Sequence, residues 1–396
     1  MEENRKKPQI RFAGYTDDWE QRKVREVADR YDNLRIPVAA NLRIPGSTPY
    51  YGANGIQDYV DGYTHEGEFI LVAEDGANDL KNYPVKCVKG RIWVNNHAHV
   101  LQGKNEIADN KFLAFAISQA DIESLLVGGS RAKLNAETLM EIDLLLPEKQ
   151  EQVSIGNYLT NLDHLITLHQ RKYNKLVDVK KSMLEKMFPK NGEKKPEIRF
   201  GGFTDDWEQR KLSEIYASIG NAFVGTATPY YVEQGHFYLE SNNIKDGQIN
   251  HNSEVFINDE FYERQKEKWL HTGDMVMVQS GHVGHAAVIP EELDNSAAHA
   301  LIMFREPKEK IEPYFLNYQY QTNKIKKKID GITTGNTIKH ILASDMQEFV
   351  VDLPDYNEQK QIGDYFRNLD NLITLHQREV EKLKNNKKSM LEKMFI

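Results

Sequence analysis

The sequence contains a single cysteine, Cys87, among 396 residues. It therefore lacks the means for an internal disulfide or a zinc site of paired cysteines, and a reducing cytoplasm is the expected location. It also lacks a long apolar run, and its first residues, MEENRKKPQIRF, carry charge with no apolar stretch behind them. We therefore expect neither a signal peptide nor a membrane anchor.

The chain has no excess of positive charge. Its 51 Lys and Arg against 59 Asp and Glu give a formal net charge of -8. This balance argues against a protein that coats nucleic acid through bulk positive charge, but not against local basic surfaces. The composition, 40% hydrophobic, 28% charged and 10% aromatic, is typical of a globular protein.

Motifs that carry catalysis are incomplete. The segment GNAFVGT at 220–226 has the two glycines of a phosphate loop, but Thr226 stands in place of the phosphate-binding lysine. The segment PDYNEQK at 354–360 faintly resembles a nuclease triad, yet its first copy at 147–153 ends in Val153. The Asn- or Asp-Pro-Pro-aromatic motif of an amino-methyltransferase is missing as well. We therefore predict that the chain is not an enzyme and carries no cofactor.

Two histidines could in principle hold a metal ion. His97 and His99 lie two residues apart on an expected strand and so share a face. In the second half, Ala297 matches His97 while His299 matches His99. A structural or hydrogen-bonding histidine is therefore favoured, and no metal site is predicted.

What the chain does contain is a duplication. The segment PQIRFAGYTDDWEQRKVREV at 8–27 returns as PEIRFGGFTDDWEQRKLSEI at 196–215, a shift of 188 residues. The segment IGNYLTNLDHLITLHQRKYNKLVDVKKSMLEKMF at 155–188 returns at 362–395, a shift of 207 residues. Such a domain-sized period indicates a duplicated unit, far longer than a solenoid repeat.

The segments enclosed by the repeated blocks differ from each other. They cover about 28–127 and about 216–334, and the two shifts show that they differ in length as well as in sequence. Identical surfaces indicate one partner bound twice. Divergent segments indicate two different ligands.

Local patterns predict mixed α/β (α+β) modules. The motif TDDWE at 16–20 and at 204–208 predicts a capped helix that continues to Val27 and Ile215. Runs such as EFILVAED, RIWVNNHAHVL, DMVMVQSG and HALIMFRE predict strands.

Short matches inside the divergent segments indicate a shared fold. The motif TPYY at 48–51 matches 228–231, and NNHAHVL at 95–101 matches NSAAHAL at 295–301.

A long helix is predicted after each module, beginning near LPEKQEQ and LPDYNEQ. Steps of four and three residues give a mostly apolar coiled-coil seam over about four heptads. Each helix would be roughly 55 Å long. Because the copies match without a gap, we predict that they pair antiparallel about a pseudo-two-fold axis, the alternative being that each packs only on its own module. The seam residues are Leu162, Ile166, His169, Tyr173, Leu176, Lys180, Met183 and Met187, and Leu369, Ile373, His376, Val380, Leu383, Lys387, Met390 and Met394.

These patterns divide the chain into five predicted segments. The segments are module 1 at 1–147, a helix at 148–188, a polar linker at 189–197, module 2 at 198–354 and a second helix at 355–396.

This layout resembles a type I restriction-modification specificity subunit over nearly the whole chain. The resemblance rests on TDDWEQRK, TPYYGANG, GEFILVAEDG, NNHAHVL and the two starts LPEKQEQVSIGNYL and LPDYNEQKQIGDYF. It implies a DNA-binding subunit whose two target-recognition modules each read half of a split, asymmetric site. The helices would set the spacer and dock two methyltransferase subunits.

The resemblance also implies where the chemistry lies. The methyltransferase partners would carry S-adenosylmethionine and methylate adenine, and two restriction/translocase subunits would use ATP and Mg. This chain would contribute double-stranded DNA binding, with no cofactor and no membrane partner.

Two sets of residues are predicted to contact DNA. The glycine-rich turns near the long helices would bind phosphate if each opens a helix, an ordinary helix cap being the alternative. Polar side chains that differ between the modules would read bases. The turn residues are Gly128, Gly129, Ser130, Arg131 and Lys133, and Gly335, Asn336, Thr337, Lys339 and His340; the base readers are Lys81, Lys86, Lys89, Arg91, Asn95, Asn96 and His97, and Asn242, Asn243, Lys245, Gln279, His282 and His285.

Two other functions remain open from the sequence. A tandem coiled-coil adaptor would bind only proteins and would show no salt-dependent, sequence-selective DNA binding. A fused restriction enzyme would need a nuclease or methyltransferase site in this chain.

Overall fold

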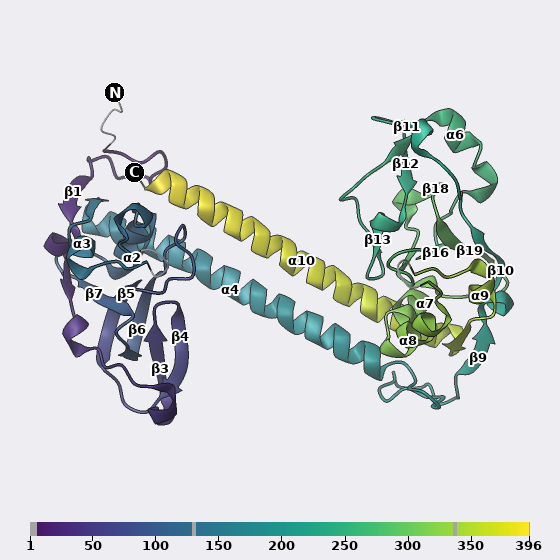
Figure 1. Cartoon of the computed structure of the whole chain (residues 1–396), viewed down its shortest axis with the longest axis horizontal. Helices are drawn as coiled ribbons and strands as arrows, with labels where there is room; N and C mark the ends of the chain where they lie inside the picture. The colour runs from purple at the N-terminus through teal and green to yellow at the C-terminus, as the bar shows by residue number, and fades with distance from the viewer. Residues whose placement is uncertain (1–5, 129–131, 336–338, 396) are drawn as a thin grey trace. The chain divides into compact units, whose positions relative to one another are not determined.

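The structure, a computed structural model, describes residues 6–128, 132–335 and 339–395. Its chain forms two compact units. Unit 1 combines the residues up to Gln170 with those from Gln377 onward, and unit 2 spans Arg171–His376. Each unit therefore contains one module and a part of each long helix (Figure 1).

Unit 1 is built on a six-stranded sheet. Its order is β2 (Ala28–Arg30), β7 (Ala98–Gly103), β5 (His65–Ala73), β6 (Val85–Val94), β3 (Pro45–Gly52) and β4 (Gly55–Val60). Alternate residues of β5 enter two separate cores, with Ile70 and Val72 in one and Phe69 and Leu71 in the other. Both faces of the central strands are therefore covered, which explains their continuous apolar runs.

Helices and turns complete module 1. The helix α2 (Asn110–Gln119) packs on the sheet because Phe112, Leu113 and Ile117 share the core with Ile70 and Val72. The remaining elements are short helices. They are α3 (Ala136–Met140), η1 (Asp32–Leu34), η2 (Ala40–Leu42) and η3 (Glu123–Leu125).

Unit 2 repeats the central four strands and the helix on them. The order β10 (Tyr216–Asn221), β19 (Leu301–Pro307), β16 (Met275–Val278), β17 (Ala286–Val288) corresponds to β2, β7, β5, β6. The helix α7 (Pro313–Tyr320) takes the role of α2, and α9 (Ala343–Gln347) that of α3. The helix α8 (Asn323–Ile332) occupies the stretch between them, where module 1 has only η3. The predicted shared fold is therefore confirmed for this central part.

The modules differ outside this common part. Module 2 adds a small sheet and a hairpin where module 1 extends its main sheet with β3 and β4. The added elements are β11 (Tyr231–Val232), β12 (His236–Leu239), β13 (Ile244–Lys245), β14 (Gln248–Ile249), β15 (Phe256–Ile257), β18 (Ala297–Ala298), α6 (Asp259–Glu263), η4 (Thr228–Tyr230), η5 (Ser241–Asn243), η6 (Lys266–Lys268) and η7 (Glu291–Leu293).

The two TPYY motifs are not structurally equivalent, so that predicted match is wrong. In module 1 the motif lies in β3, where Tyr50 pairs with Trp93 of β6. In module 2 its first three residues form η4, with Pro229 in the first turn, and Tyr231 then starts β11 in the small sheet. Different strand partners determine the conformation of the same four residues.

The short helix predicted at the start of each half ends where expected, at Val27 and Ile215, but its predicted start at the TDDWE motif is wrong. The EQRK segments form the strands β1 (Glu20–Lys23) and β9 (Glu208–Lys211), because they pair with the apolar strands β8 (Asp143–Leu146) and β20 (Val350–Leu353). Only single helical turns follow, α1 (Val24–Val27) and α5 (Leu212–Ile215).

Both long helices are confirmed as α4 (Lys149–Lys186) and α10 (Tyr356–Met394). In unit 1 the early part of α4 meets the late part of α10, with Asp163 Oδ1 2.6 Å from Lys387 Nζ. In unit 2 the late part of α4 meets the early part of α10, with Lys180 Nζ 2.7 Å from Asp370 Oδ1. The helices therefore pack antiparallel, and the seam lysines are explained by these ion pairs.

Each long helix ends against an aromatic core that is repeated in both units. Phe395, just after α10, packs on Trp19 and on Phe112 of α2 in unit 1. Phe188, just after α4, packs on Trp207 in unit 2. The alternative in which each helix packs only on the module before it is therefore wrong.

Candidate nucleic-acid interface

In module 1, a loop is closed at its two ends, Val127 and Lys133, beside the end of the central strand β5. Val127 and Lys133 exchange two backbone hydrogen bonds, each 2.9 Å from nitrogen to oxygen. Lys133 also bridges to Asp75, just after β5, and the Leu134 N–H donates to the Glu74 oxygen at 2.8 Å. The loop is thus joined to the end of β5 by backbone contacts.

Module 2 has the corresponding loop in the corresponding place. Thr334 and His340 exchange backbone hydrogen bonds of 2.9 and 2.8 Å. His340 bridges to Ser280, just after β16, and the Ile341 N–H donates to the Gln279 oxygen at 3.0 Å. The two predicted glycine-rich turns therefore belong to one recurrent structure.

The predicted position of these turns, just before the long helices, is wrong, so the condition that each turn opens its long helix is not met. The elements α3 and β8 lie between the loop and α4, and α9 and β20 lie between the loop and α10, because β8 and β20 first pair with β1 and β9. Some predicted contact residues lie outside the described residues. These are Gly129, Ser130, Arg131, Asn336 and Thr337.

The described basic residues of the loops already have acidic neighbours. Lys133 Nζ lies 2.8 Å from Glu74 Oε1, and Lys339 Nζ lies 2.9 Å from Asp330 Oδ1. His340 is exposed. Contact with a phosphate would therefore compete with these ion pairs in both modules.

The predicted basic residues of β6 do not form one row. Lys89 and Arg91 lie on one face of the strand and Lys86 on the other, because side chains alternate along a strand. Arg91 Nε lies 3.1 Å from Glu66 Oε1, and Lys81 is exposed in the loop before β6. These four residues therefore do not form one continuous basic surface.

His97 is the predicted base reader that lies next to the loop. Its Nδ1 lies 2.5 Å from Asp75 Oδ1, and Asp75 itself bridges to Lys133. Asn96 is exposed. Asn95 is buried and accepts a hydrogen bond from the His97 N–H, so it shapes the turn and presents no group to the surface.

Two further segments of module 2 are joined by histidines. His282 Nε2 contacts the Ser241 oxygen at 3.0 Å, and the Asp246 N–H donates to His285 Nδ1 at 3.1 Å. Burial lowers the pKa of His285, which favours the neutral ring that accepts this hydrogen bond. The 279–285 segment therefore joins the loop to the 241–246 segment.

The remaining predicted base readers of module 2 differ in how far their side chains are buried. Asn242 and Lys245 are exposed and Gln279 is partly exposed. Asn243 is fully buried, accepts a hydrogen bond from the Glu240 N–H and donates to the Asn250 oxygen. Asn243 therefore builds the turn that presents its neighbours.

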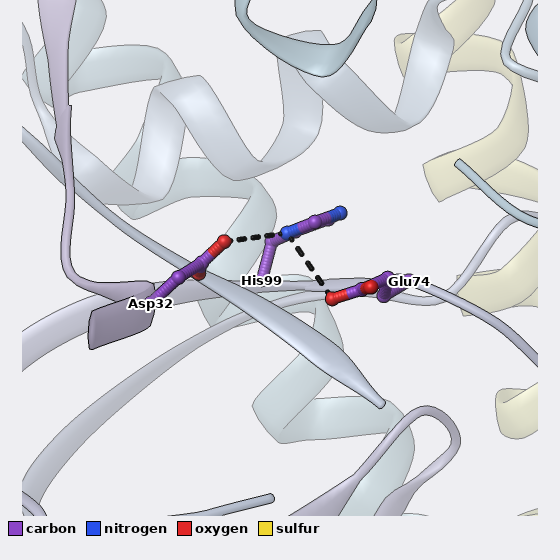
Figure 2. Close-up of side chains that lie close together, drawn as sticks. All are labelled: Asp32, Glu74 and His99. Atoms are coloured by element: carbon purple, nitrogen blue, oxygen red, sulfur yellow. Dashed lines mark hydrogen bonds and ion pairs between the residues drawn. The ribbon is translucent and has the colours of Figure 1, made fainter. Parts of the chain in front are cut away.

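An ionic cluster beside the loop of module 1 escaped the sequence patterns. Figure 2 shows His99 of β7 between Asp32 and Glu74, with distances from its Nδ1 of 2.7 Å to Asp32 Oδ2 and 3.6 Å to Glu74 Oε2. Burial opposes ionisation of Asp32, but hydrogen bonds from His99 and the Val100 N–H outweigh it and lower the pKa of the Asp32 carboxyl. The signal available in the sequence was the acidic pair after β5 together with NNHAHVL.

These three side chains have the donor types of a metal site, but their neighbours disfavour one. Arg35 Nη1 lies 2.6 Å from Glu74 Oε2, and Lys133 pairs with the other oxygen. Burial opposes ionisation of Glu74, yet these two hydrogen bonds lower the pKa of its carboxyl. The positive charge that a bound cation would supply is thus already provided by side chains.

The predicted match between His99 and His299 is wrong in space. His99 pairs with Val72, two residues before Glu74, and Ile302 pairs with Met277, two residues before Gln279. Ile302 therefore holds the place of His99 in module 2.

The incomplete catalytic motifs have structural roles. In the 220–226 segment, Asn221 ends β10 and the Gly225 oxygen contacts His299 Nε2 at 3.0 Å. Glu358 is bound by Arg199 through two contacts of 2.6 and 2.7 Å. The segment at 354–360 thus serves to start α10.

Within the described residues, no helix is both long and apolar enough to cross a membrane.

Two segments of the chain, 16–177 and 204–385, match the family described as Type I restriction modification DNA specificity domain. The repeat that contains the two modules is therefore also a repeat of a known domain.

Individual relatives agree with this family match. A putative type I restriction enzyme specificity subunit of Haemophilus influenzae is 30% identical over 88% of this chain and 88% of its own length. The type I restriction enzyme MjaVIII specificity subunit of Methanocaldococcus jannaschii is 23% identical over 95% of this chain and 91% of its own. A crystal structure of an S subunit from M. genitalium has the same fold, with a TM-score of 0.66, 16% identity, and 98% and 99% of the two chains covered.

Proposed function

The chain belongs to the family of type I restriction-modification DNA specificity proteins, and on this premise we propose that it is the non-catalytic DNA-binding subunit of such a system. Each module reads one half of a split, asymmetric DNA target. The long helices set the spacer between the halves and dock the subunits that methylate adenine.

One observation carries this proposal. Both units keep the same four central strands and pair the closed end of a loop with the residues just after β5 or β16, while the polar residues beside that loop differ. His97 and Asp75 lie beside the loop in module 1, and His282 and His285 belong to the segment beside it in module 2. A constant frame with different surface groups suits two recognition sites for two different sequences.

The proposed partners are double-stranded DNA, two methyltransferase subunits and two restriction/translocase subunits, acting together in the cytoplasm. S-adenosylmethionine belongs to the methyltransferases, and ATP and Mg to the restriction subunits. This chain supplies binding and spacing. Its net charge of -8 indicates that the partners contribute much of the positive surface around DNA.

The long helices carry an exposed apolar pair that occurs twice. Leu165 and Leu168 of α4 are each 39% exposed, and Leu372 and Leu375 of α10 are 43% and 52% exposed. Residues three apart on a helix face the same side. Two identical apolar pairs suit one partner type bound twice, which supports docking of two methyltransferase subunits here.

Glutamate substitutions test this docking surface. Leu168→Glu together with Leu375→Glu should reduce co-purification of the methyltransferase by about tenfold or more, because a charge is placed inside an apolar contact. The matched control, Leu168→Met with Leu375→Met, keeps the apolar area and should leave the complex intact. Equal recovery of the partner with both double variants would place docking elsewhere.

DNA binding by the complex distinguishes this proposal from a protein-only adaptor. The complex of this chain with its methyltransferase should prefer a duplex with both half-sites over duplexes in which either half is scrambled. Its affinity should fall steeply between about 50 and 200 mM salt, because phosphate contacts release counterions. Equal binding to all three duplexes would contradict sequence recognition, and no binding would favour the adaptor.

A further inference from the structure

Both ring nitrogens of His99 have an oxygen partner. Nδ1 lies 2.7 Å from Asp32 Oδ2, and Nε2 lies 2.9 Å from the Leu134 backbone oxygen. With 1% exposure, the ring lies inside module 1. It therefore connects η1, through Asp32, with the residue that follows Lys133.

The partners of His99 are themselves held by further hydrogen bonds. Asp32 uses its other oxygen to accept the Val100 N–H at 2.8 Å, which fixes the carboxylate against β7. Arg35 Nη1 donates to Glu74 at 2.6 Å and to the Ala98 oxygen at 2.8 Å. Because each charged group has partners, the cluster is a rigid connection between η1, β5 and β7.

This cluster holds the base of the closed loop. Leu134 is bound twice, since its oxygen accepts from His99 and its N–H donates to the Glu74 oxygen at 2.8 Å. Lys133, which closes the loop with Val127, adds its ion pair to the Glu74 carboxylate at 2.8 Å. The positions of Lys133 and Leu134 relative to the central sheet therefore depend on the same buried cluster.

Module 2 holds its loop without this cluster. Ile302 stands in place of His99, and Gln279 in place of Glu74. The backbone bond from the Ile341 N–H to the Gln279 oxygen remains, but the charged side chains are replaced by an apolar and a neutral one. One chain thus contains the loop with the cluster and the loop without it.

From this contrast we infer that His99 is a positioning residue for DNA recognition by module 1. It fixes Lys133 and Leu134 beside the His97–Asp75 pair, and so determines how strictly module 1 reads its half-site. His99 is buried and does not touch DNA, so its influence passes through the loop. This inference rests on the proposed DNA-specificity function.

The test uses His99→Leu in the complete complex with its methyltransferase. Adenine methylation is mapped across a genome that otherwise lacks it, and module 1's half-site is identified by exchanging residues 28–127. Discrimination against single mismatches in that half-site should fall by about tenfold, comparable to the loss of one base contact. The half-site read by module 2 should be unchanged, which shows that the chain is folded.

Two further variants separate positioning from general loss of packing. Asp32→Asn keeps the side-chain volume but removes the carboxylate that faces His99, so it should relax the same half-site. Leu101→Ala removes core packing from β7, where Leu101 is fully buried, without touching the loop. It should lower stability and leave the half-site sequence unchanged.

Hydrogen exchange gives a readout that does not depend on DNA. The amides of Val127, Lys133 and Leu134 should exchange faster in His99→Leu and in Asp32→Asn, but not in Leu101→Ala. Unchanged exchange, an unchanged half-site, or equal relaxation by Leu101→Ala would each overturn the inference. If the unmodified complex marks no defined sequence, the proposed function fails instead, and the exchange result still decides whether His99 holds the loop.

Discussion

At the scale of single residues, one ion pair fastens the start of each half to the start of its long helix. Arg11 binds Glu151 through two contacts of 2.6 and 2.7 Å, and Arg199 binds Glu358 at the same distances. The side chains are 13% exposed on the arginine and 0% on the glutamate. Such bidentate geometry combines charge with fixed orientation, which raises the pKa of both arginines.

Removing the arginine should leave a buried carboxylate without its partner. Arg11→Ala should lower the free energy of unfolding of unit 1 by roughly 3 kcal/mol, and Arg199→Ala should do the same in unit 2. Chemical denaturation of the complete chain measures both. Lys7→Ala is the control, because Lys7 and Asp18 are 57% and 58% exposed, and it should cost less than about 1 kcal/mol. An equally small effect of Arg11→Ala would contradict the role assigned to the pair.

Single residues also show why sequence similarity located the site only in part. The match of His99 with His299 followed the letters of NNHAHVL, but strand pairing places Ile302 where His99 lies. Burial removed Asn95 and Asn243 from the surface. The two turns were selected from the sequence because they combine glycine and polar residues, and contact of these turns and of His97 with DNA stays a prediction. Their ionic partners, above all Asp32 and Arg35, come from a distant segment, so only the fold reveals them.

At the scale of elements, a glycine in each long helix allows another helix to approach closely. A Cβ added at Gly156 of α4 would lie 2.8 Å from Asp109 Oδ1 and 2.8 Å from the Phe112 nitrogen. Asp109 caps α2 by accepting the Phe112 N–H at 2.9 Å. At the equivalent Gly363 of α10, the nearest atom is the flexible Cγ of Glu312 at 3.0 Å.

Replacing either glycine with alanine should therefore not stabilise the protein as it usually does in a helix. In an open helix, Gly→Ala stabilises by about 1 kcal/mol. Gly156→Ala should instead destabilise unit 1 by roughly 1–3 kcal/mol, because the methyl group displaces the cap of α2. Gly363→Ala should cost less, since a side chain yields more easily than backbone. Thermal unfolding of the two variants checks this order, and a more stable Gly156→Ala protein would contradict it.

Elements with strong periodicity were predictable from the sequence, and elements with ambiguous partners were not. The spacing of apolar residues predicts the helices α4 and α10. Continuous apolar runs predict the strands β5 and β16. The EQRK segments carry a helix signal, yet they become strands because their backbones pair with those of the apolar strands β8 and β20. The TPYY motifs take different conformations because their neighbouring strands differ. Tertiary pairing outweighed local preference in both cases.

At the scale of the whole molecule, the proposed spacer function depends on two continuous helices. Each runs unbroken through its residues, Lys149–Lys186 and Tyr356–Met394. Seven residues inserted after Gln170 and after Gln377 keep the seam in phase and add about 10 Å of helix, roughly three base pairs. The spacer between half-sites should lengthen while both half-sites stay unchanged. Methylation mapping that returns the original spacer would contradict the ruler role, and insertion in one helix alone should abolish methylation.

The most direct measurement is the adenine methylation produced when this chain is co-expressed with a cognate methyltransferase in a genome that otherwise lacks the mark. The account predicts a split, asymmetric motif. Exchange of residues 28–127 for those of another specificity subunit should change one half of that motif and leave the other half and the spacer intact. A complex that forms but marks no defined sequence, or an exchange that alters both halves, would contradict the claim that each module reads its own half-site.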